Sequence, residues 1–295
     1  MRRRGADGWA MGLELHALNL TRLLAKGRPL GAVATLGRQV LDLPPVTMRE
    51  LGLAADQRFA EPLLERMGAM LVESFDVSPY EGATHIADFN AAVTPPRRYD
   101  AVLDFGTLEH IFDQARAFAN VRALLGPGGR VGHVLPVNNL AGHGFWQYSA
   151  DLLHGIYAPA NGFAWARVFL ASALDPRWWY EVPPPGAGRR TDIASVEPVV
   201  AVVAAELGGE GAEAPPQQAF YHAAWVDEAA HGAPMASGRR FGAVRKLAQQ
   251  ARWAAPGAYT PARNLLHIAR LATGRSPLGL AGGGLRRWRV SELVR

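Results

Sequence analysis

The sequence contains no cysteine among its 295 residues. This absence excludes disulfide bonds, thiolate catalysis and metal sites built on cysteine. No apolar run approaches the roughly 18 residues that are needed to span a bilayer, and no signal-peptide core follows the basic residues Arg2–Arg4. We therefore expect a soluble cytoplasmic protein. No metal-ligand motif stands out either, so we expect no bound metal.

Acidic residues are scarce in the last part of the chain. Residues 226–295 carry 12 Lys and Arg against three Asp and Glu, a net charge of +9. The first 225 residues carry 19 Lys and Arg against 23 Asp and Glu, a net charge of −4. This distribution argues against a nucleic acid bound across the main body. It predicts a basic tail that contacts an anionic surface or another subunit, or packs on the body.

The most informative stretch runs from residue 99 to residue 139. Residues 99–105 form an apolar run typical of a strand buried on both faces. Asp113 is placed to cap a helix, and the glycine-rich residues 126–129 end that helix and turn the chain into a strand at 130–135. This is the pattern of a right-handed βαβ unit, and its polar loops fall at the sheet edge where open α/β sheets bind ligands.

The segments YDAVLDFGTLEHIFD (99–113) and LLGPGGRVGHVLPVNN (124–139) resemble the second half of class I S-adenosylmethionine-dependent methyltransferases. Within that superfamily the chain is most similar to a bacterial subgroup with LGRQ near its start and GHGF(W/Y)Q(Y/F)S after the fifth strand. Here these motifs are Leu36–Gln39 and Gly142–Ser149. The resemblance implies an α/β, Rossmann-like fold with seven mostly parallel strands, flanking helices, an antiparallel last strand and a C-terminal helical basic tail.

The chain accordingly divides into an N-terminal helical segment (1–30), a methyltransferase domain (31–225) and a basic helical tail (226–295). We expect strands at 32–36, 70–75, 84–87, 99–105, 130–135, 163–171 and 198–206. A capping box at Thr47–Glu50 predicts a helix that runs towards Met67, either continuous or broken near Pro62, and Ser149 is placed to cap another helix. Residues 175–190 are predicted to be an aromatic-rich loop, either a substrate wall or a surface loop.

S-adenosylmethionine is the cofactor that the resemblance implies. Its binding residues are expected at the carboxyl ends of the first four strands: Gly37, Arg38, Gln39, Asp76, Asp88, Phe89, Asn90, Asp104, Gly106, Thr107 and Leu108. An acid such as Asp76, or alternatively Glu73, commonly binds ribose hydroxyls in such folds. Asp88 would accept from the adenine amine while Phe89 covers the ring. Residues 88–90 could equally form a turn that has no part in binding adenine.

The chain lacks the glycine-rich loop that most members of the superfamily carry after the first strand. Gly37 is the single glycine there, and Arg38 and Gln39 follow it. One interpretation is that Gly37 makes the tight turn and Arg38 holds the methionine carboxylate through its planar fork of donors. The alternative is that Arg38 pairs with an acidic neighbour, and that the cofactor is weakly bound or absent.

Two histidines are candidates for catalysis. His110 follows the fourth strand, and the usual histidine pKa of about 6.5 suits a general base. The alternative is that Glu109 or His110 fixes the loop by bonding to the backbone. His143 lies between two glycines in the loop after the fifth strand. It is the leading candidate for a base or for a group that orients the substrate.

These features predict a methyltransferase that acts on a small-molecule or sugar-like acceptor by in-line methyl transfer, a reaction that mainly requires alignment of the two reactants. The missing glycine-rich loop leaves open a non-catalytic, methyltransferase-like binding or scaffold protein. A nicotinamide-dependent oxidoreductase is disfavoured, because no G-x-G-x-x-G motif follows the first strand.

Overall fold

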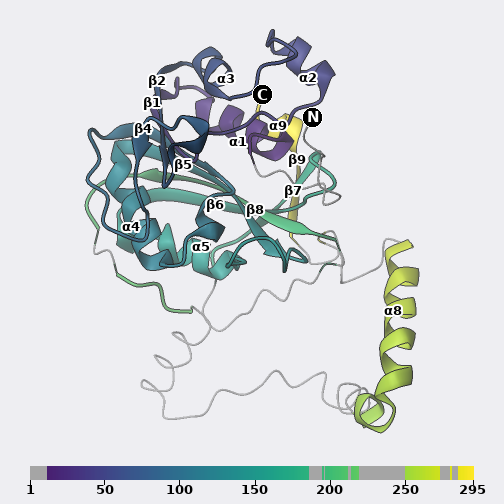
Figure 1. Cartoon of the computed structure of the whole chain (residues 1–295). Helices are drawn as coiled ribbons and strands as arrows, with labels where there is room; N and C mark the ends of the chain where they lie inside the picture. The colour runs from purple at the N-terminus through teal and green to yellow at the C-terminus, as the bar shows by residue number, and fades with distance from the viewer. Residues whose placement is uncertain are drawn as a thin grey trace.

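The computed structural model describes residues 12–185, 195, 197–211, 214–218, 250–272, 280 and 285–295. These residues form an α/β, Rossmann-like fold with one large sheet and helices on both of its faces (Figure 1). No helix in the described part of the chain is long and apolar enough to cross a membrane. The predicted domain boundary between residues 225 and 226 lies outside the described residues.

The described residues contribute nine strands to the sheet, in the order β3-β2-β1-β4-β5-β8-β6-β7-β9. They are β1 (Gly31–Leu36), β2 (Ala69–Asp76), β3 (His85–Ile86), β4 (Tyr99–Phe105), β5 (Leu125–Asn138), β6 (Phe163–Ser172), β7 (Trp178–Val182), β8 (Val199–Leu207) and β9 (Arg286–Arg289). Strands β1 to β5 pair in parallel, and β8 is antiparallel to both β5 and β6. The seven predicted strands, with the last one antiparallel, are therefore confirmed.

Strands β7 and β9 were not predicted. β7 occupies residues 178–182, where we expected a loop, and β9 lies in the tail that was expected to be helical. The two strands pair with each other, and the Trp288 Nε1–H donates to the Glu181 carboxylate at 2.6 Å. β9 is the edge strand and β7 has only 5 residues, so neither shows the long apolar run of a strand at the centre of the sheet. The loop prediction is wrong for residues 178–182, and residues 186–190 lie outside the described part.

The glycine-rich residues 126–129 also differ from the prediction of a turn. β5 begins at Leu125, and these residues are part of it. The register between β4 and β5 shifts between Tyr99 and Ala101, which accommodates the additional residues in β5. The strand predicted at 130–135 is thus the buried centre of a longer one.

Several helices begin where the sequence predicts. Helix α1 (Leu15–Ala25) lies in the N-terminal segment, α4 (Gln114–Leu124) follows Asp113, and α5 (Ala150–Ile156) follows Ser149. The Asp113 carboxylate accepts from the Arg116 N–H at 2.9 Å, and the Ser149 hydroxyl accepts from the Leu152 N–H at 3.2 Å, which confirms both caps. The tail contains α8 (Pro256–Ala272) and the short α9 (Val290–Leu293).

The helix predicted from Thr47 towards Met67 is interrupted, as the alternative of a break near Pro62 implied. Two separate helices, α2 (Pro45–Glu50) and α3 (Glu61–Arg66), occupy this region, and neither has a side-chain cap. Proline lies in the first turn of each helix. Proline is tolerated there and disrupts a helix interior, so Pro62 marks a helix start within the predicted run.

Both faces of the sheet are covered. Helices α4 and α5 pack on one face through residues such as Phe118 and Leu153. Helices α1 and α3 pack on the other face through residues such as Leu20 and Leu63 (Figure 1). Because parallel strands are buried on both faces, the loops at their carboxyl ends are the natural place for a ligand.

Candidate active site

The strand order reverses between β1 and β4, and Gly37 and Thr107 follow these two strands. The Thr107 hydroxyl donates to the Leu36 carbonyl at 2.7 Å. Gly37 has a φ of +69°, and a Cβ built on it would lie 3.0 Å from Thr107 Oγ1 and 3.9 Å from an oxygen of Asp76. The bare backbone of Gly37 thus leaves a cradle beside a hydroxyl and a carboxylate, at the point where open α/β sheets bind ligands.

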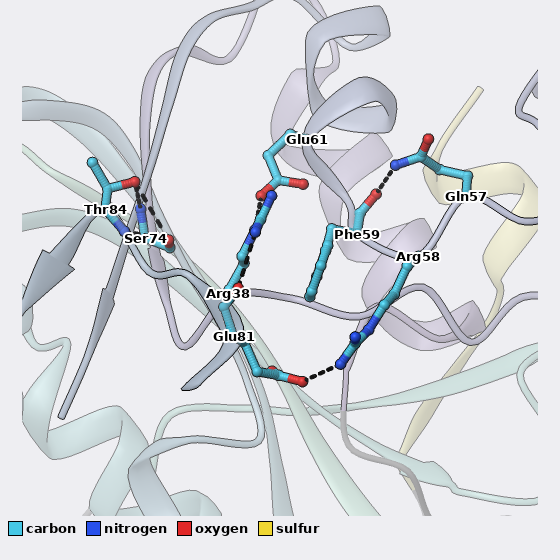
Figure 2. A network of polar contacts seen from close by, with 8 residues as sticks. All are labelled: Arg38, Gln57, Arg58, Phe59, Glu61, Ser74, Glu81 and Thr84. Carbon is cyan, nitrogen blue, oxygen red and sulfur yellow. Dashed lines mark hydrogen bonds and ion pairs between the residues drawn. The ribbon is translucent and has the colours of Figure 1, made fainter. Parts of the chain in front are cut away.

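Arg38 lies next to this cradle and is held by protein groups (Figure 2). Its Nε–H donates to Glu61 at 2.6 Å, and a terminal N–H donates to the Glu81 carbonyl at 2.9 Å. Its guanidinium carbon lies 3.9 Å from the centroid of the Phe59 ring. Of the two alternatives for Arg38, pairing with an acidic neighbour is the geometry that the structure shows. Gln39 is buried and donates to the carbonyl of the last β1 residue at 2.5 Å, which stabilises the turn.

Residues 88–90 form a turn after β3. Asp88 Oδ1 accepts from the Asn90 N–H at 2.8 Å, and this hydrogen bond lowers the pKa of the exposed Asp88 carboxyl. The side-chain oxygen of Asn90 accepts from the Phe112 N–H at 3.1 Å, which ties the turn to the loop after β4. Phe89 is buried, and its ring meets the ring of Phe75 edge-on. The Phe89 ring therefore offers little surface to an adenine, whereas the Asp88 carboxylate remains available as an acceptor.

Asp104, at the end of β4, is fully buried and fixes the loop that contains Gly106, Thr107 and Leu108. Its Oδ1 accepts from the Thr107 N–H at 2.9 Å, and its Oδ2 lies 2.8 Å from His133 Nδ1. The other ring nitrogen of His133 contacts the Tyr157 hydroxyl.

Burial, and next the charge of Asp104, hold the pKa of Tyr157 well above its usual value, so this hydroxyl stays protonated. The Asp104 carboxylate is an acceptor, so His133 carries a proton on Nδ1 and donates it to Asp104. Asp104 is thus engaged by protein donors on both oxygens and supports the loop from the interior.

Glu109, His110 and His143 converge beyond this loop. Glu109 is fully buried, and His143 Nε2 lies 3.3 Å and His110 Nε2 4.0 Å from its Oε1. Burial raises the pKa of the Glu109 carboxyl, although its contact with His143 opposes this shift. Burial also lowers the pKa of His110, and the adjacent His143 adds to this effect. The cluster is a polar group of mixed acid and base character at the carboxyl end of the sheet.

The backbone of Glu109 anchors the loop after β5. Its carbonyl accepts from the Phe145 N–H at 2.8 Å and the Trp146 N–H at 3.3 Å. Gly144 packs against Glu109 with a φ of +80°, and a Cβ built on Gly144 would lie 2.8 Å from Glu109 Cγ. The close approach of Gly144 therefore determines where Glu109 and His143 lie relative to each other.

We expect Gly144→Ala to displace the loop from Glu109. The left-handed backbone alone costs an alanine about 1–2 kcal/mol, and the added methyl group clashes with Glu109 as well. Hydrogen exchange of the Phe145 amide should accelerate, and chemical denaturation should show the lower free energy of unfolding. Gly27→Ala is the matched control, because Gly27 has a similar φ of +77° and its Cβ would meet no atom within 4 Å. Equal effects of the two substitutions would contradict this packing.

Exposed aromatic side chains flank the cluster. Phe112 is 72% exposed, Phe145 is 70% exposed and Trp146 is 39% exposed. The Phe112 ring lies 6.3 Å from that of Phe145 and 6.4 Å from that of Trp146, between ring centroids. Aromatic faces of this kind bind sugar rings and planar organic molecules through their apolar area. A separate apolar pocket of about 300 Å³ lies between α4 and α5, lined by residues such as Phe118, Ile156 and Phe163.

The structure thus brings the predicted residues together in two groups. Gly37, Asp76 and Thr107 meet at the cradle, and His110 and His143 meet at Glu109. Neither Glu109 nor His133 was among the predicted site residues. The available signal for His133 was an ionisable residue in the middle of the otherwise apolar stretch 131–135.

No protein-family model matches the chain, and no curated protein matches it. Solved structures do resemble it. An S-adenosylmethionine-dependent methyltransferase from Mesorhizobium loti is 19% identical and has a TM-score of 0.30, over 45% of this chain and only 56% of its own length. The N-methyltransferase NodS from Bradyrhizobium japonicum WM9, in complex with S-adenosyl-l-homocysteine, is 13% identical over 66% of this chain and 86% of its own, with a TM-score of 0.39.

A third example is the 1,6-didemethyltoxoflavin-N1-methyltransferase from Burkholderia thailandensis, with bound 1,6-didemethyltoxoflavin and S-adenosylhomocysteine. It is 17% identical over 65% of this chain and 78% of its own, with a TM-score of 0.36. All three likenesses are distant.

Proposed function

We propose that this protein is an S-adenosylmethionine-dependent methyltransferase that acts on a small-molecule or sugar-like acceptor. The observation that carries the proposal is the cradle formed by Gly37, Asp76 and Thr107. It lies where the strand order reverses, in a sheet whose β8 is antiparallel between β5 and β6. That insertion is the topology which the resemblance of the sequence to class I methyltransferases implies.

The residues at the cradle fit such a donor in part. Gly37 leaves room for close approach of a ligand to the backbone, and the Asp76 carboxylate can accept from ribose hydroxyls. Asp88, an exposed carboxylate after β3, can accept from the adenine amine. The methionine carboxylate has a less obvious partner, because Arg38 is bound to Glu61 and Glu81.

The donor supplies an activated methyl group when it is bound, so the chain mainly has to align the acceptor and manage its proton. The exposed rings of Phe112, Phe145 and Trp146 are placed to hold an acceptor ring. The Glu109–His110–His143 cluster lies beside them and is the polar group at which a nucleophilic atom of the acceptor would be oriented and activated.

Calorimetric titration with S-adenosylmethionine and S-adenosylhomocysteine tests this function. We expect saturable binding, and we expect Gly37→Ala to weaken it at least about tenfold, since the new methyl group fills the cradle and approaches Thr107. Each tenfold loss corresponds to about 1.4 kcal/mol. No binding at millimolar ligand would reject the enzyme assignment.

Gly27→Ala is the matched control for this experiment. Gly27 has a φ of +77°, close to that of Gly37, and a Cβ there would meet no atom within 4 Å. Both substitutions should therefore carry a similar backbone cost of about 1–2 kcal/mol. Only Gly37→Ala should change the affinity for the donor.

One observation favours a second candidate function, a non-catalytic, methyltransferase-like binding or scaffold protein. The single arginine after the first strand pairs with Glu61, and the chain lacks the glycine-rich loop. Under this alternative the folded, stable protein binds neither S-adenosylmethionine nor S-adenosylhomocysteine. The same titration therefore separates the two functions.

A further inference from the structure

Three potential metal ligands lie together at the end of β4 and in the loop after β5. One carboxylate oxygen of Glu109 and one ring nitrogen each of His110 and His143 lie within 4.8 Å of one another. We propose that these three residues bind a divalent transition-metal cation, with zinc as the first choice. This proposal differs from the sequence-based expectation of no metal, which rested on motifs of neighbouring residues.

The buried state of Glu109 is the strongest argument for a cation. Its side chain is 0% exposed, and neither of its carboxylate oxygens has a hydrogen-bond partner among the described residues. The buried Nε2 of His143 also lacks one there, since it lies near Oε1 without hydrogen-bond alignment. A buried charge without partners is costly, and proteins pair such groups or use them to bind metals. A cation between these atoms would satisfy all three at once.

The geometry and the donor types fit a small transition-metal ion. Ligands at about 2.1 Å from a tetrahedral zinc lie about 3.4 Å from one another, and the separations from Glu109 Oε1 are 3.3 Å to His143 and 4.0 Å to His110. Two imidazoles and one carboxylate are a known ligand set of catalytic zinc, which leaves one position open. Magnesium and calcium prefer sites built from oxygen alone.

The backbone that carries the ligands is fixed by hydrogen bonds, whereas the two histidine side chains are partly exposed. The Phe145 and Trp146 amides bind the Glu109 carbonyl, and the His143 N–H donates to the Leu140 carbonyl at 2.9 Å, so the backbone of both loops is fixed. By contrast, the His110 side chain is 51% exposed and that of His143 is 23% exposed.

The role of the cation towards an acceptor rests on the proposed function, whereas the site itself does not. The loops that carry the ligands also carry the exposed rings of Phe112 and Phe145, which contact each other. An acceptor hydroxyl that ligates the cation would lose its proton to solvent more readily, because a bound cation lowers the pKa of a coordinated oxygen acid.

The test uses the full chain without a histidine tag, freed of metal with a chelator and titrated with zinc against a coloured competing chelator. We expect saturable binding of one zinc per chain. Glu109→Gln and His143→Ala should each weaken binding at least about 100-fold, the upper end of the loss caused by removing a group that merely orients a ligand. Absence of saturable binding to the wild type, or unchanged affinity in both variants, would overturn the proposal.

His85→Ala is the matched control. His85 Nε2 also lies 3.3 Å from a glutamate oxygen, that of Glu73, but Tyr99 and Arg97 already bind this carboxylate. Zinc affinity should be unchanged in His85→Ala, and equal losses in this variant and in His143→Ala would show adventitious binding by surface histidines.

A second measurement keeps the test valid if Glu109→Gln fails to fold. His110→Ala removes a half-exposed side chain, and cobalt substituted for zinc reports the ligand set through its visible absorption. The spectrum should change in His110→Ala and remain unchanged in His85→Ala. Titrating S-adenosylmethionine in parallel separates the two proposals: zinc binding without donor binding leaves the metal site standing, and donor binding without zinc rejects the metal site alone.

Discussion

Replacing Asp104 with alanine is expected to lower the free energy of unfolding by about 2–6 kcal/mol, at about 1–3 kcal/mol for each of the two buried donors left without an acceptor. The Asp104 side chain is fully buried, and both of its oxygens are engaged. Oδ1 accepts from the Thr107 N–H, and Oδ2 accepts from His133. Alanine would leave these donors buried without an acceptor, and the cost of such groups exceeds the net value of the bonds themselves.

The same substitution should also weaken donor binding, because Asp104 holds Thr107 beside the cradle. Asp104→Asn is the control: its side-chain oxygen can still accept from the Thr107 amide, while its amide group faces His133 in place of the second acceptor. We expect Asp104→Asn to retain more of the donor affinity than Asp104→Ala. Its free energy of unfolding, measured by urea denaturation, should lie between those of Asp104→Ala and the wild type. A free energy of unfolding for Asp104→Ala within about 0.5 kcal/mol of the wild type, the usual range for surface substitutions, would contradict this account.

The central part of the fold could be predicted because its residues are buried on both faces. Strands such as β4 (Tyr99–Phe105) and β8 (Val199–Leu207) appear in the sequence as apolar runs. β7 and β9 could not be predicted in this way. Their stability comes from pairing with each other across a long stretch of chain, as Trp179 does with Trp288, and no local pattern encodes that partner.

The candidate site shows the same division. The loops at the carboxyl ends of β1 and β4 were predicted as the ligand edge, since chain order and strand burial determine them. The pairing of Arg38 with Glu61 depends on where α3 packs, and the convergence of Glu109 with His143 depends on a close contact of Gly144. Such contacts are tertiary. The sequence therefore predicts the candidate residues but not which of them contact one another.

Trp179→Ala is expected to lower the free energy of unfolding by about 3–5 kcal/mol, the usual cost of removing a large buried aromatic side chain. The sequence left two roles open for the aromatic residues of 175–190, a substrate wall or a surface loop. Trp179 fits neither, because it is 0% exposed and its ring packs against Phe169, with 5.3 Å between the ring centroids. The folded fraction of Trp179→Ala should therefore bind the donor with unchanged affinity. If the variant instead lost affinity without losing stability, Trp179 would belong to the substrate site.

Trp179→Phe isolates the polar part of this contact. The Trp179 Nε1–H donates to His16 Nδ1 at 2.9 Å, and the other nitrogen of His16 lies 3.1 Å from the Ser172 carbonyl, which can only accept. His16 must then carry its proton on Nε2 and accept at Nδ1, so phenylalanine leaves a buried acceptor unpaired. That loss alone should cost about 1–3 kcal/mol, and His16→Phe combined with Trp179→Phe should recover part of it, because no unpaired polar atom then remains. If the double substitution costs the sum of the two single ones, the hydrogen bond does not couple α1 to β7.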